Sequence, residues 1–75
     1  MPMKSLPRVL EFWGGPQDGK RITTEEFIAS YPKGIASFPI PGTTLLHVYK
    51  KDPDDPSGKV LYLGEFTPEA VTQLS

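Results

Sequence analysis

The chain has 75 residues, enough for one domain with a small hydrophobic core and too few for two. It contains no cysteine, so neither a disulfide framework nor a cysteine zinc site contributes to its stability. Its net charge of −1 disfavours non-specific binding to nucleic acid, and no segment is apolar for long enough to span a membrane. We therefore expect a cytoplasmic protein, with residues 1–7 as a flexible leader and residues 8–75 as a single domain.

The first predicted elements are a strand, a tight turn and a short returning strand. Residues 8–13 are typical of a strand, with Leu10 and Phe12 on one face and Val9, Glu11 and Trp13 on the other. Residues 14–19 form the turn, because the glycines permit positive φ angles and the proline fixes one φ angle. Residues 20–22 then pair back on the first strand.

A helix is predicted over about residues 24–30. Thr23 followed by Glu26 three positions later is a capping box, a common signal for the start of a helix. Ile22 before the cap and Phe27 after it fit a hydrophobic staple, which fixes the angle at which the chain enters the helix.

The second half of the chain predicts three strands and another helix. The prolines in residues 35–42 remove ladder donors, so this segment suits a sheet edge. Residues 43–50 and 59–64 are rich in apolar and aromatic side chains and form a hairpin. Thr67 caps a second helix over about residues 68–74. The fold class is α+β, with a small antiparallel sheet or partly open β-barrel of four to five strands and two short helices.

Both faces of this sheet carry large apolar or aromatic side chains. We expect Leu46 and Val48 to pack inward with Leu10 and Phe12. The opposite face then presents a group of rings on or near the surface: Trp13, His47, Tyr49 and Tyr62. A patch of this kind on a small domain marks a surface for binding or self-association. Two alternatives remain open: a strongly curled barrel that buries both sets, and a dimer that covers the second face.

The turn and its neighbours are a second candidate binding site. The residues concerned are Gly14, Gly15, Asp18, Lys20 and Arg21. Backbone amides of glycines beside two cationic side chains can bind an anion, and Trp13 with Tyr49 can stack on a base. A small nucleotide-like ligand would fit this reading. The alternative is a structural hairpin corner whose charges are solvated.

No pattern in the chain predicts catalysis or metal binding. His47 is the only histidine and has no partner at a spacing typical of a nucleophilic or metal site. The acidic loop with Asp52, Asp54 and Asp55 lacks the glycine and the final glutamate of a calcium-binding EF-hand loop. We expect a protein that is not an enzyme and has no cofactor and no metal.

Three segments resemble a group of very short proteins from bacteriophages, prophages and actinobacteria. They are FWGGPQDG at residues 12–19, LHVY at 46–49 and VLY at 60–62. Members of this group have a GGPxDG turn, a central HxY strand and a final aromatic strand. The resemblance implies a phage-type origin, and so the cytoplasm of a host cell, without implying a mechanism. The helix at residues 24–30 departs from the pattern of the group.

The functional expectation is a non-enzymatic, phage-type accessory protein. It would act by binding, sequestering or blocking a host component, such as a defence signal or a host protein. The alternative is a small structural or assembly protein of a phage particle that forms homo-oligomeric contacts. Sequence-specific binding to nucleic acid ranks below both, and no membrane partner is expected.

Overall fold

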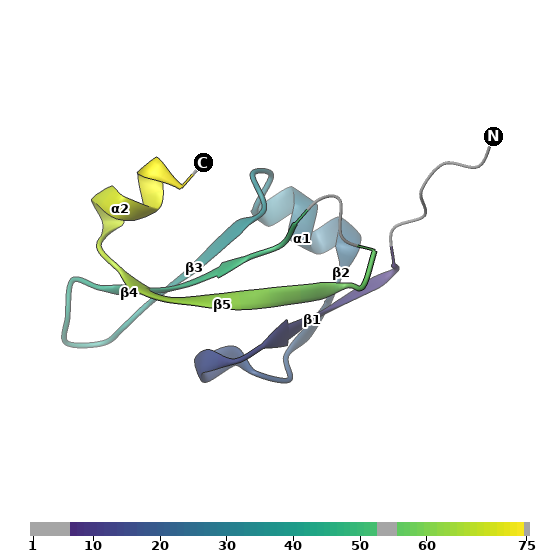
Figure 1. Ribbon diagram of the computed structural model, residues 1–75, viewed down its shortest axis with the longest axis horizontal. Coiled ribbons are helices and arrows are strands. Elements are labelled where there is room, and N and C mark those ends of the chain that lie inside the picture. The colour runs from purple at the N-terminus through teal and green to yellow at the C-terminus, as the bar shows by residue number, and fades with distance from the viewer. Residues whose placement is uncertain (1–6, 53–55, 75) are drawn as a thin grey trace.

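The computed structural model describes residues 7–52 and 56–74, which form one curled sheet and two short α-helices (Figure 1). The elements are β1 (Val9–Trp13), a 3-10 turn (Gly15–Gln17), β2 (Arg21–Thr23), α1 (Thr24–Ser30), β3 (Ile35–Pro39), β4 (Leu46–Lys50), β5 (Lys59–Phe66) and α2 (Pro68–Gln73). The sheet has the order β2-β1-β5-β4-β3 and curls into a half-barrel. The predicted α+β fold with a partly open barrel is confirmed.

The sheet is mixed, because the pairing of β1 with β5 is parallel. The β1–β2, β3–β4 and β4–β5 pairs are antiparallel, as expected. Phe12 lies opposite Val60 and Trp13 opposite Leu61 in the parallel pair. This pairing brings the first and last strands together and places β1 between β2 and β5.

Both helices begin where their capping residues predict. The Thr23 hydroxyl oxygen accepts a hydrogen bond of 3.1 Å from the backbone N–H of Glu26, and α1 follows. The Thr67 hydroxyl oxygen accepts one of 3.2 Å from the N–H of Ala70, and α2 follows. None of the described helices is long and apolar enough to cross a membrane.

The core lies on the face of the sheet that α1 covers, called here the inner face. Its buried members are Leu10, Phe12, Phe27, Ala36, Tyr49 and Val60. The Phe12 ring meets three other rings edge-on, with centroid distances of 6.3 Å to Phe27, 6.0 Å to Phe38 and 5.0 Å to Tyr49. Phe27 is the buried residue of α1, so the staple region of this helix packs onto the inner face.

A register shift bends the sheet between β4 and β5. Tyr62 lies opposite Tyr49 and Gly64 opposite Val48, so Leu63 is an extra residue on β5. Gly64 has a φ angle of +126°, a conformation that favours glycine. Such a bulge increases local twist and helps to curl the sheet. At this point β4 is buried on both sides, because Val48 and Tyr49 are each 0 % exposed.

Two expectations concern segments that the structure leaves undescribed. Residues 1–6 of the expected leader and residues 53–55 of the acidic loop, including Asp54 and Asp55, lie outside the described residues. Pro7 and Asp52 are the parts of these segments that the structure places. The Pro7 carbonyl accepts a hydrogen bond from the Thr24 hydroxyl at the start of α1.

Candidate functional site

The turn between β1 and β2 is fastened to the core by the Tyr49 hydroxyl. This hydroxyl donates a hydrogen bond of 2.6 Å to the carbonyl of Gly14 and accepts one of 2.8 Å from the N–H of Gln17. Gly15 lies so close to the rings below it that an added Cβ would be 2.6 Å from the Tyr49 hydroxyl and 2.7 Å from Tyr62 Cδ1. The turn therefore closes over the Tyr49 and Tyr62 rings and covers one end of the core.

The amides of this turn donate within the protein. The N–H of Gly14 donates to Asp18 Oδ1 at 2.7 Å, and the N–H of Gly19 donates to the Phe12 carbonyl at 2.8 Å. The N–H of Asp18 donates to the Gly15 carbonyl at 3.2 Å. These bonds match the structural alternative for the turn, in which Asp18 closes a hairpin corner. Of the three glycine amides that suggested an anion site, those of Gly14 and Gly19 are therefore directed to partners inside the protein.

Lys20 and Arg21 lie on opposite sides of the sheet, as successive residues near a strand do. The Lys20 ammonium lies 5.4 Å from the centroid of the Phe38 ring, which packs against the inner-face core. Arg21 is exposed on β2 and pairs in register with Glu11 of β1. The two cationic side chains therefore do not converge on a single anion-binding site.

The structure corrects the expected position of Tyr49, which is fully buried on the inner face and not on an outer surface. Its ring contacts the Tyr62 ring at a centroid distance of 5.0 Å, and His47 Nδ1 lies 2.9 Å from the Tyr62 hydroxyl. Partial burial, the Glu65 carboxylate and the Tyr49 side chain all raise the pKa of the Tyr62 phenol. His47, Tyr49 and Tyr62 thus share a face as expected, but that face holds Phe12 and not Trp13.

The opposite face, called here the outer face, carries alternate residues of the two central strands. They are Val9, Glu11 and Trp13 of β1 with Lys59, Leu61 and Leu63 of β5. Four of them are large apolar side chains that remain between 42 and 50 % exposed: Val9, Trp13, Leu61 and Leu63. The Lys59 ammonium lies 4.6 Å from the centroid of the Trp13 ring. Of the nine candidate residues from the sequence, Trp13 and Arg21 lie on this side.

A groove of about 320 Å³ runs along the outer face beside β1. Its lining combines the indole of Trp13 with the charged side chains of Glu11, Arg21 and Lys59, and Val9, Ser57 and Gly58 complete it. The sequence placed Val9 on the same face as Trp13, but it did not identify Lys59, Leu61 and Leu63 as surface residues. The alternation within residues 59–64 could have identified the three β5 residues. Val60 and Tyr62 occupy the inner face, so Lys59, Leu61 and Leu63 between and beside them face outward.

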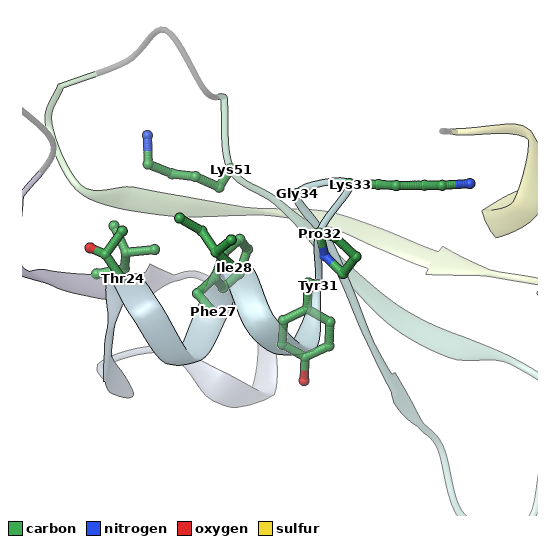
Figure 2. A pocket seen from close by; sticks show the side chains of 9 residues that line it. Thr24, Phe27, Ile28, Tyr31, Pro32, Lys33, Gly34 and Lys51 are labelled. Atoms are coloured by element: carbon green, nitrogen blue, oxygen red, sulfur yellow. The ribbon is translucent and has the colours of Figure 1, made fainter. Parts of the chain in front are cut away.

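A separate cavity of about 170 Å³ lies beside α1, lined mainly by apolar side chains (Figure 2). Leu10 and Phe27 contribute buried core surface, and Ile28 of α1 is 51 % exposed. Figure 2 shows the Lys51 side chain extending toward Thr24, while the Lys33 side chain points away. The Lys51 ammonium donates a hydrogen bond of 2.6 Å to the Asp52 carbonyl. None of the nine candidate residues lines this cavity.

Within residues 7–52 and 56–74, no three His, Cys, Asp or Glu side chains gather in a way that could hold a metal ion. Comparisons with models of protein families, with curated proteins and with solved structures found no match to the chain. The resemblance to short phage and actinobacterial proteins therefore stays a prediction.

Proposed function

We propose that this chain is a non-catalytic binding protein that holds a protein partner on the outer face of its sheet. The observation that carries the proposal is the group of four half-exposed apolar side chains, Val9, Trp13, Leu61 and Leu63. In the phage setting that the resemblance implies, the partner is a protein of the host cell, which the chain would sequester or block.

Leaving these four apolar side chains in water is unfavourable, and a partner that covers them removes that cost. Each Å² of apolar surface removed from water contributes about 25 cal/mol, so half-exposed apolar side chains gathered on one face support association. Tryptophan is among the residues that most often dominate the energy of an interface. Trp13 retains 46 % exposure although Lys59 lies over its ring.

The strands hold this surface in place before any partner arrives. β1 is bonded on both sides, by β2 and by β5, and Trp13 is in register with Leu61 of the neighbouring strand. Side chains fixed on paired strands lose less conformational entropy on binding than side chains on a mobile loop. The outer face is therefore preorganised for binding to a complementary surface.

The proposal is tested by comparing Leu61→Asp with Ile28→Asp. The two side chains are 50 and 51 % exposed, but Ile28 lies on α1, away from the outer face. Tagged wild type and both variants are used to capture proteins from a lysate of the host bacterium, with far-ultraviolet circular dichroism as the folding check. A protein recovered by the wild type and by Ile28→Asp, but lost from Leu61→Asp, supports the proposal. Equal recovery by all three forms contradicts it.

A further inference from the structure

The outer face carries charged side chains around its apolar group, and most of them are positive. Arg21 of β2 and Lys59 of β5 each lie in register with Glu11 of β1, from opposite sides. Lys50 of β4 lies in register with Leu61. Because residues paired across strands share a face, three exposed cations flank the apolar group, against one carboxylate. The face is positive on a chain whose net charge is −1.

We propose that the occupant of this face is an acidic, apolar segment of the partner protein. Its apolar side chains would cover Trp13, Leu61 and Leu63, and its carboxylates would meet Arg21 and Lys50 at the two borders of the apolar group. The inference rests on the proposed function and adds the chemistry of the partner to it. Arginine suits this task because its planar guanidinium can bind a carboxylate through two parallel hydrogen bonds.

Two other occupants fit the same residues less well. A second copy in a two-fold dimer would bring the same positive face against itself, and like charges in an interface disfavour the contact. A nucleic acid would meet the cations, but it would leave Val9, Leu61 and Leu63 without apolar partners, and nucleic-acid affinity depends on more phosphate contacts than three cations provide. An acidic apolar peptide satisfies both the charges and the apolar surface.

Trp13 is the only tryptophan in the chain, so its fluorescence reports directly on this face. The probes are a leucine–glutamate peptide, a leucine–lysine peptide of the same length and pattern, and a single-stranded DNA oligonucleotide. We expect the leucine–glutamate peptide to change the Trp13 emission and to bind at least tenfold more tightly than the leucine–lysine peptide. Added salt should weaken the binding, because the attraction at the borders is between exposed charges.

The matched variants are Arg21→Glu and Lys20→Glu, which make the same change of charge at adjacent positions on opposite sides of the sheet. We expect Arg21→Glu to weaken binding of the leucine–glutamate peptide by at least about fivefold, since it converts an attraction into a repulsion. Lys20→Glu should leave the affinity within about twofold, because its ammonium lies over Phe38 on the inner side. Circular dichroism confirms that both variants are folded.

Several outcomes would overturn the inference. They are equal affinity for both peptides, tighter binding of the oligonucleotide than of the acidic peptide, equal effects of Arg21→Glu and Lys20→Glu, or a stable dimer in sedimentation that Leu61→Asp dissociates. The capture experiment with Leu61→Asp and Ile28→Asp tests the proposed function separately. A partner lost with Leu61→Asp but equally retained by Arg21→Glu and Lys20→Glu would leave the binding function standing and refute the acidic partner.

Discussion

The Tyr49 hydroxyl shows how one atom ties a turn to a core. It satisfies the Gly14 carbonyl and the Gln17 N–H at once, from a ring that is fully buried. We predict that Tyr49→Phe lowers the free energy of unfolding by about 2 kcal/mol, because the ring packing is kept while two backbone groups lose their partner. Urea denaturation followed by circular dichroism measures the change.

Tyr31→Phe is the control for this substitution. Among the described residues, the Tyr31 hydroxyl makes no hydrogen bond, although its ring packs against Phe27 at a centroid distance of 5.2 Å. Its removal should change the free energy of unfolding by less than about 0.5 kcal/mol. Equal losses in the two variants would show that the hydroxyl of Tyr49 does not hold the turn.

The Tyr62 phenol gives the protein a pH dependence in the alkaline range. Its pKa is raised in the folded state, first by burial and then by Glu65 and Tyr49, so the folded protein keeps a proton that the unfolded chain has lost. The free energy of unfolding should therefore fall as the pH rises through and above the unfolded tyrosine pKa of about 10. Urea midpoints across this range should fall less steeply for Tyr62→Phe than for the wild type. An unchanged slope would contradict the assignment.

At the scale of elements, the turn of residues 14–19 is the part whose backbone is most constrained. Gly15 has a φ angle of +64° and no space for a Cβ, whereas Gly19 has a φ angle of +88° and open space around it. We predict that Gly15→Ala costs about 3 kcal/mol, from backbone strain together with the clash against Tyr49 and Tyr62. Gly19→Ala should cost about 1 kcal/mol, from backbone strain alone. Thermal melting compares the two, and equal costs would exclude a close contact at Gly15.

Local sequence signals predicted the helices well, but they did not predict which face of β4 packs into the core. Thr23 and Glu26 determine the start of α1 through bonds between near neighbours, which the sequence displays directly. The choice of buried face in β4 has no such signal, because Val48 and Tyr49 point to opposite sides and both are apolar enough to be buried. The bulge at Leu63 also shifts by one residue which positions of β4 and β5 lie opposite each other. Such a bulge depends on contacts across the sheet, which local sequence signals do not display.

At the scale of the whole molecule, the parallel pairing of β1 with β5 decides which residues become the outer face. Trp13 and Leu61 are 48 positions apart in the numbering and become neighbours through this pairing. Turn and cap residues indicate where hairpins form, but they do not indicate which distant strands meet. The sequence therefore predicted that apolar surface would be left over and named Trp13 as part of it, while the β5 residues of that surface required the structure.

Phe12 and Trp13 are adjacent in β1 but lie on opposite faces of the sheet, so we predict different effects when each is replaced by alanine. Phe12 is 1 % exposed and contacts three rings, whereas Trp13 is 46 % exposed on the outer face. Phe12→Ala should cost about 4 kcal/mol, a large share of the roughly 4 to 11 kcal/mol by which a domain of this size is stable. Trp13→Ala should cost less than about 1 kcal/mol, mainly through lost contact with Lys59.

Circular dichroism and partner capture together separate these roles. We expect Phe12→Ala to be largely unfolded at 37 °C or to melt far below the wild type, because heating removes what little stability remains. Trp13→Ala should melt close to the wild type and yet recover less of any partner that Leu61→Asp also loses, since both residues lie on the outer face. If Trp13→Ala unfolded the domain as Phe12→Ala does, the indole would be a structural residue, and the outer face would lose the side chain on which its binding role most depends.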